Sequence, residues 1–515
     1  MPKKSILKKT FQFGYLTFIS RILGIIRDIL KIRFLGVSAM SDAFIMAYRI
    51  PNFLRKIFAE GALSSSSVPV FVKLQRSKNK KLINNTMSAS FLFFEGIVAL
   101  LCIFAFLFPH IVIKMVAPGF SPEQVSYAIP FVRILFPFIF FVSSSALLAA
   151  ALQSIHHFFA PAFGPIILNI FFIGSLLICL YFNKDVLFLC KGIILGGSAN
   201  FLLHLIIYFR YHFNFGSISR EAIVHFKTIL KKFIPCLLGV GIIEINLFVD
   251  SIIASFLPKG SISVLTYSNR FMQIPLGVFA VGFATVLLPY FSRITLYAPK
   301  RLKFYLLETM KFSTWVIMPA IFFLIHSAEH LFLLLFRNKA TPAQMLEAQV
   351  LLTIYASGLI FFSVNKILVN IFYSLKDTKT PTIGTVVATV VNVICNIVGI
   401  YFWGSYGIAA ATVSSGFTLT LFCLIYLYKK HNILFLSKRY FSFFIKYLLQ
   451  FIIGMSLFYG MHICASSYLK QIQYSHFFLS DWGYWLFTIP LFLFTMGFMF
   501  LTKKIHRIKL YFLDK

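Results

Sequence analysis

The sequence predicts an all-α polytopic membrane protein, with about fourteen transmembrane helices in two six-helix lobes and two further C-terminal helices. Three observations predict this class. Of the 515 residues, 59% are hydrophobic and only 12% are charged, a composition outside the range of soluble globular proteins. Apolar runs of about 20 residues, long enough to cross a bilayer, recur along the chain. Two parts of the chain also resemble each other, which indicates an internal duplication.

Each predicted span is an apolar run bounded by polar or cationic connections. The first run follows a basic N-terminus, but it lacks a small-residue cleavage site and leads directly into the second run. We therefore expect it to be retained as a helix and not removed as a signal peptide. The predicted spans cover approximately 11–35, 41–72, 86–110, 127–153, 161–182, 187–209, 233–257, 264–292, 306–328, 350–374, 382–402, 407–428, 440–463 and 483–502.

Lysine and arginine are concentrated in alternate connections between the spans. Loops rich in these residues normally stay in the cytoplasm, so both termini are predicted to be cytoplasmic. The net charge of +33 then reflects topology. Nucleic acid is not an expected partner, because no basic soluble segment exists to bind it. The cation-rich connections lie at 3–9, 76–81, 220–232, 300–303, 376–379, 429–439 and 503–509.

The duplication is seen most clearly where residues 152–164 align without gaps with residues 372–384. Both segments end one span, cross a short turn and open the next span with a proline, a residue tolerated at a helix start. Six spans per copy is an even number, so the copies have the same orientation in the membrane, as in transporters with parallel repeats. The predicted domains are an N-lobe at 1–215, a C-lobe at 216–432 and a C-terminal helix pair at 433–515.

Among the arginines inside predicted spans, Arg21, Arg27, Arg55 and Arg270 are the candidates for a binding site. A cation at the bilayer centre costs about 2.5 to 3.5 kcal/mol, so such side chains normally face an aqueous cavity. Arginine keeps its charge and offers a fork of donors that matches phosphate oxygens. The pattern favours a site for an anionic, diphosphate-bearing substrate. Alternatively, some of these arginines pair with carboxylates. Arg21 and Asp28 are seven residues apart and lie on nearly the same helix face.

Two carboxylates in the second predicted span, Asp42 and Glu60, are further candidates. Glu60 could close a gate by pairing with an arginine in one state, or could be a static partner. Asp42 could instead extend its side chain to the membrane surface near the end of the span. Gly61 and Pro69 interrupt this span, and broken helices in transporters tend to line the site. Close packing by small residues is the alternative explanation.

The chain is not expected to be an enzyme. It contains 15 Asp and Glu residues in all, and it has no metal-spaced histidine cluster, nucleophile elbow or nucleotide-binding glycine loop. We expect no metal and no cofactor. Its 7 cysteines show no pairing pattern. Energy for any transport must then come from an ion gradient or the membrane potential.

Five segments of the chain carry a recognisable pattern: 20–28, 41–44, 50–62, 117–120 and 372–381. They resemble the signatures of the MurJ (MviN) lipid II flippases, a family of the multidrug/oligosaccharidyl-lipid/polysaccharide exporter superfamily. The resemblance implies two lobes around a central cavity and a C-terminal helix pair that forms a groove for a lipid tail. It assigns the essential cavity cations to Arg21, Arg27, Arg55 and Arg270, and a functional carboxylate to Asp42. Where relatives often carry acidic residues near Arg270, this chain has Asn269 and Gln273.

The implied substrate is lipid II, undecaprenyl-pyrophosphoryl disaccharide-pentapeptide, moved across the bacterial inner membrane for peptidoglycan synthesis by alternating access. The expected partners are this lipid, membrane lipids and the cell-wall synthesis machinery. Three alternatives remain at this stage. The chain could flip another polyprenyl-linked glycan, because the same diphosphate would be presented to arginine. It could be a small-molecule antiporter of the superfamily, although cavity cations argue against cationic drugs. It could be a cell-wall scaffold without transport activity.

Overall fold

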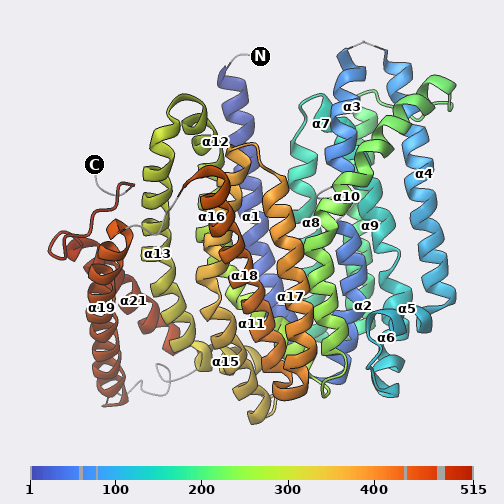
Figure 1. Ribbon diagram of the computed structural model, residues 1–515. Helices are drawn as coiled ribbons and strands as arrows, with labels where there is room; N and C mark the ends of the chain where they lie inside the picture. The colour runs from blue at the N-terminus through green and yellow to red at the C-terminus, as the bar shows by residue number, and fades with distance from the viewer. Residues whose placement is uncertain (1–2, 57–61, 77–78, 434–437, 472–481, 513–515) are drawn as a thin grey trace. The chain divides into compact units, whose positions relative to one another are not determined.

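The computed structural model covers residues 1–515 and describes all of them except 1–2, 57–61, 77–78, 434–437, 472–481 and 513–515 (Figure 1). The described residues form helices and no strands, so the predicted all-α class is confirmed. Within this part of the chain, 10 helical segments are long and apolar enough to cross a membrane. The count of fourteen spans stays a prediction. The chain divides into two compact units, Met1–Ser263 and Val264–Lys515, and the lobe boundaries at 215 and 432 also stay predictions.

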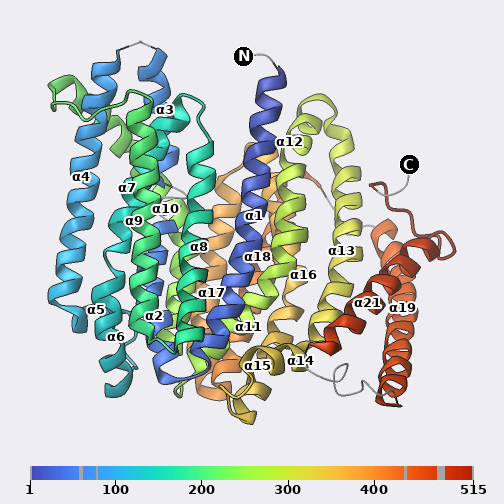
Figure 2. The same cartoon turned by 180° about the vertical axis from the view of Figure 1, so that it is seen from behind.

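The described residues of the N-terminal unit form ten α-helices and the first residues of an eleventh. In it α1 packs along α8, and α7 packs against both α4 and α9 (Figure 2). The interfaces are filled by buried aliphatic and phenylalanine side chains. The helices are α1 (Lys3–Leu35), α2 (Ala39–Arg55), α3 (Leu63–Arg76), α4 (Lys80–Leu107), α5 (Pro109–Val116), α6 (Pro122–Leu135), α7 (Phe138–Ser154), α8 (Phe159–Phe182), α9 (Val186–Arg210) and α10 (Arg220–Ala254).

Two described helices, α2 and α3, lie within the predicted second span. Helix α2 ends at Arg55, four residues after Pro51, and α3 begins at Leu63. A proline inside a helix removes a backbone donor and bends the chain. The side chain of Ser38 fixes the start of α2, because its oxygen accepts a hydrogen bond from the Ser41 backbone N–H. These local signals place Asp42 in the first turn of α2 and Arg55 at its end.

The C-terminal unit continues α11 and ends with the helix pair α19 and α21. Pro275 ends α11, and a π-helical segment, η2 (Leu276–Val281), follows it, in keeping with the lost backbone donor. Helix α19 packs on α13 and on α21. The elements are α11 (Ser261–Pro275), η2, α12 (Gly282–Tyr297), η3 (Pro299–Arg301), α13 (Leu302–His326), α14 (Ala328–Phe336), α15 (Pro342–Ser357), α16 (Leu359–Ser374), α17 (Lys379–Trp403), α18 (Ser405–His431), α19 (Lys438–Gln471) and α21 (Gly483–Thr502).

The turn that aligned in the two sequence copies has the same backbone conformation in both units. His156 and Lys376 both have left-handed backbones, with φ of 61° and 59°. The following residues close the turn in the same way: the His157 N–H donates to the Leu152 carbonyl at 3.0 Å, and the Asp377 N–H donates to the Phe372 carbonyl at 2.9 Å. This agreement supports an internal duplication.

The turn in the C-terminal unit also holds an anchored carboxylate, Asp377. Burial alone would raise its pKa, but hydrogen bonds from the Thr380 hydroxyl and backbone N–H and from the Lys430 ammonium group lower the pKa to about 2. The Lys430 Nζ lies 3.2 Å from the Asp377 carboxylate. The contact ties the turn before α17 to the end of α18, so it stabilises this end of the helix pair.

Candidate substrate-binding residues

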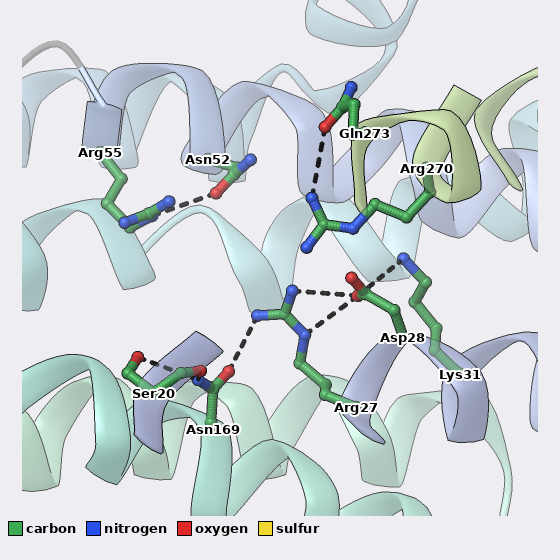
Figure 3. Close-up of polar contacts among 9 residues, drawn as sticks. All are labelled: Ser20, Arg27, Asp28, Lys31, Asn52, Arg55, Asn169, Arg270 and Gln273. Atoms are coloured by element: carbon green, nitrogen blue, oxygen red, sulfur yellow. Dashed lines mark hydrogen bonds and ion pairs between the residues drawn. The ribbon is translucent and has the colours of Figure 1, made fainter. Parts of the chain in front are cut away.

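Arg27 is held in a fixed orientation inside the N-terminal unit. Its Nε and Nη2 donate to one carboxylate oxygen of Asp28 at 3.2 and 3.0 Å, and its Nη1 donates to the amide oxygen of Asn169 on α8 at 3.1 Å (Figure 3). The Asn169 amide nitrogen donates to the Ser20 carbonyl at 3.0 Å, which fixes the amide. The Phe172 ring lies below the guanidinium, 5.4 Å from its carbon.

These contacts leave part of the Arg27 guanidinium for a ligand. A guanidinium has five N–H bonds, and three of them bind Asp28 and Asn169. One N–H on each terminal nitrogen therefore has no acceptor among the described residues. The side chain is 24% exposed, whereas Asp28 is 7% exposed. Arg27 is thus oriented by buried groups and still presents two donors, the arrangement that recognises a phosphate in a bidentate manner.

Asp28 pairs with Arg27 and with Lys31, whose Nζ lies 3.7 Å from it. The alternative pairing of Arg21 with Asp28 is not observed. The Asp28 carboxylate is instead bound by the guanidinium of the adjacent residue, Arg27. Arg21 is exposed, and it makes no hydrogen bond or ion pair with the described part of the chain. In the sequence-predicted set, Arg27 and Asp28 are therefore brought together and Arg21 is not.

Arg55 has a different environment at the end of α2. Its Nε donates to the amide oxygen of Asn52, one turn earlier, at 3.0 Å (Figure 3). Its side chain is half-buried. The Asn52 amide helps to orient the guanidinium and carries no charge of its own. Glu60, the candidate gating residue that follows Arg55, lies outside the described residues.

Arg270 lies on α11 in the C-terminal unit. Its Nη1 donates to the Gln273 side-chain oxygen at 3.4 Å, and Gln273 in turn donates to the Asn269 side chain (Figure 3). These are the two positions where the sequence has neutral amides. The amides can orient the guanidinium, but they add no negative charge beside it.

Asp42 is fully buried, and its hydrogen-bond partners are residues far from it in the sequence. It accepts hydrogen bonds from the Gly260 N–H at 2.6 Å, from the Ser263 N–H and hydroxyl at 2.9 and 2.5 Å, and from the Gln124 amide at 3.3 Å. Gly260 and Ser263 lie at the start of α11, where backbone N–H groups have no partner within the helix. A carboxylate from α2 thus caps the N-terminus of α11, a favourable position for negative charge.

Sequence reasoning missed three kinds of residue at these sites. Asn169 gave no signal, because amides inside spans are more often contacts between helices. Gly260 and Ser263 resemble an ordinary helix start, and nothing in the sequence indicates that their partner is Asp42. Lys366 on α16 is exposed and lies inside the predicted span 350–374. The rule that identified the arginines would also have identified this cation.

A family model described as lipid II flippase MurJ matches residues 32–482 of the chain. The chain belongs to the lipid II flippase MurJ family. Among similar MurJ sequences, the probable lipid II flippase MurJ of Vibrio cholerae is 31% identical over 80% of this chain and 81% of that protein. The one from Haemophilus influenzae is 32% identical, over 86% of this chain and 90% of that protein. The predicted family resemblance is therefore confirmed.

Solved structures agree with the MurJ assignment. A structure described as lipid II flippase MurJ in an inward closed conformation matches with a TM-score of 0.78 and 26% identity, over 96% of this chain and 98% of that one. An inward-facing MATE family transporter shares the fold, with a TM-score of 0.68 and 16% identity over 80% of this chain and 94% of that one. With its many apolar helices, this MurJ family member is a multi-pass protein of the inner membrane.

Proposed function

We propose that the protein is a lipid II flippase that moves undecaprenyl-pyrophosphoryl disaccharide-pentapeptide from the inner to the outer leaflet of the cytoplasmic membrane. The relatives from Vibrio cholerae and Haemophilus influenzae, both described as probable lipid II flippases, support this activity. The single structural observation that carries the proposal is Arg27, which is oriented by Asp28 and Asn169 with two N–H bonds left for a ligand. The proposed role is transport and not catalysis.

In the proposed mechanism the arginines bind the diphosphate, and the polyprenyl tail stays in lipid beside α19 and α21. Arg27, Arg55 and Arg270 are the proposed diphosphate ligands, and exposed Arg21 attracts the anion. Asp28 acts as the partner that fixes Arg27. Release on the far side requires weaker binding in the second state, because a ligand held equally by both states shifts no equilibrium. We therefore expect some arginines to change partners during transport.

Asp42 is proposed to act as a lock that holds the start of α11 against α2 and α6. The flanking connections around residues 37 and 259 carry few cations, so this end is assigned to the extracytoplasmic side, with both termini in the cytoplasm. Asp42→Asn replaces one accepting oxygen by a donor that faces backbone N–H groups. Loss of even one charge-assisted hydrogen bond costs about 1.5 to 3 kcal/mol. This loss should favour a state in which the start of α11 is no longer held against α2 and α6. A cysteine at Gly260 should then react faster with a polar thiol reagent, and an unchanged rate would contradict the lock.

The membrane potential is a sufficient energy source for this movement. Each charge that crosses 100 mV gains or loses about 2.3 kcal/mol. A diphosphate anion moving outward is favoured by an inside-negative potential, so a coupled ion is not required. Flipping that continues unchanged after the potential is collapsed would refute this part of the proposal.

The decisive experiment is a headgroup-accessibility assay in vesicles that contain the purified protein and lipid II. We expect lipid II to become accessible on the opposite face, with Arg27→Ala inactive although it inserts normally. Another polyprenyl-diphosphate glycan offered in the same assay separates a lipid II flippase from a broader one. No movement of either lipid would support the scaffold alternative and refute transport.

A further inference from the structure

The N-terminal unit contains a buried carboxyl group that the proposed substrate site does not use. Glu95 lies near the middle of α4, and only 3% of its surface is exposed. Its Oε2 accepts a hydrogen bond from the Ser143 hydroxyl on α7 at 2.8 Å. Its Oε1 is buried and has no hydrogen-bond partner among the residues that the structure describes. An isolated carboxylate in apolar surroundings is so unfavourable that such a group takes up a proton instead.

The surroundings of Glu95 offer no compensating charge. From α7 it is faced by Ser143 and Ser144, and the Ser144 hydroxyl is itself fully buried without a partner in the described part of the chain. The ionisable group that interacts with Glu95 is the Cys102 thiol, two turns further along α4. Helices α3, α5, α6 and α10 also pack against α4, and their described residues contribute no ion pair to this carboxyl group.

A count of hydrogens also favours the neutral acid. The Ser143 oxygen lies 2.8 Å from Glu95 Oε2 and 3.2 Å from the Phe140 carbonyl oxygen. A hydroxyl has one hydrogen to donate, so with an ionised Glu95 the Ser143 hydroxyl can donate to only one of these two acceptors at a time. If Glu95 carries a proton on Oε2, its O–H donates to Ser143 and Ser143 donates to Phe140. One added proton therefore makes both contacts of Ser143 hydrogen bonds.

We propose that Glu95 is a proton-binding site within the N-terminal unit, buried beside the Ser143 hydroxyl. The ligand is a proton, and Ser143 supplies the oxygen that accepts a hydrogen bond from the neutral acid. The site is separate from the substrate arginines and does not depend on the proposed function.

Infrared difference spectroscopy on the purified full-length protein tests the bound proton. The difference between wild type and Glu95→Gln at neutral pH should contain the carbonyl stretch of a protonated carboxylic acid, and the band should disappear at alkaline pH. Glutamine has the shape of the neutral acid, so the variant should fold. Glu123→Gln is the control, because Glu123 is exposed and paired with Lys259, and its difference spectrum should contain bands of an ionised carboxylate. Absence of the acid band for Glu95 would overturn the proposal.

Discussion

Replacing Arg27 by lysine separates the charge of this side chain from its shape. The guanidinium uses three N–H bonds on Asp28 and Asn169 and keeps two for a ligand. A lysine ammonium group offers three donors from one point, so it cannot serve both protein partners and two phosphate oxygens. Loss of one charge-assisted hydrogen bond costs about 1.5 to 3 kcal/mol, which corresponds to about a tenfold to a hundredfold weaker binding of the diphosphate.

The assay compares the binding of a short-chain polyprenyl diphosphate with that of the matching monophosphate. Arg27→Lys should lose most of the preference for the diphosphate but keep its dependence on ionic strength, since the charge is unchanged. Arg133→Lys is the matched control. Arg133 also has an aromatic ring beneath it and a hydrogen bond from Nε, to the Phe106 carbonyl at 3.2 Å. Wild-type binding by Arg27→Lys, or an equal loss in Arg133→Lys, would refute the reasoning.

Three further changes test the packing and the charges. Asn169→Leu should raise the KM for substrate without loss of folding, because Arg27 loses the group that orients it; an unchanged KM would contradict this positioning role. The pKa of Asp377 is lowered to about 2, so its stabilising contribution is complete above its unfolded pKa of about 4 and is lost as the pH falls toward 2. We therefore expect the stability of Asp377→Asn to fall less than that of wild type as the pH is lowered over this range. Circular dichroism measured during acid unfolding checks this. Gly407→Ala places a Cβ 2.1 Å from the Gly399 carbonyl oxygen, and the overpacking should lower the stability by about 1 to 3 kcal/mol; a thermal midpoint equal to that of wild type would show that α17 and α18 can separate at little cost.

Much of the fold could be predicted from the sequence, because its signals are local. Run length and hydrophobicity identified the helical class. The repeated turns at His156 and Lys376 could be found by alignment, because the two copies keep the same short pattern. The cations of the candidate site were found from the energetic cost of a cation at the bilayer centre, and Lys366, which also lies inside a predicted span, was passed over.

The partners of these residues could not be predicted. Arg27 binds Asn169, 142 positions away, and Asp42 binds Ser263, 221 positions away. The sequence by itself determined the membrane class, the order of apolar helices, the family motifs and the presence of charge within spans. The tertiary structure alone decided that Arg27 binds the Asp28 carboxylate, that Asp42 caps the N-terminus of α11, and that Glu95 lacks an ion-pair partner within the described residues. The physical reason is that a hydrogen bond between helices depends on how each helix is rotated and packed, which is set by the whole bundle.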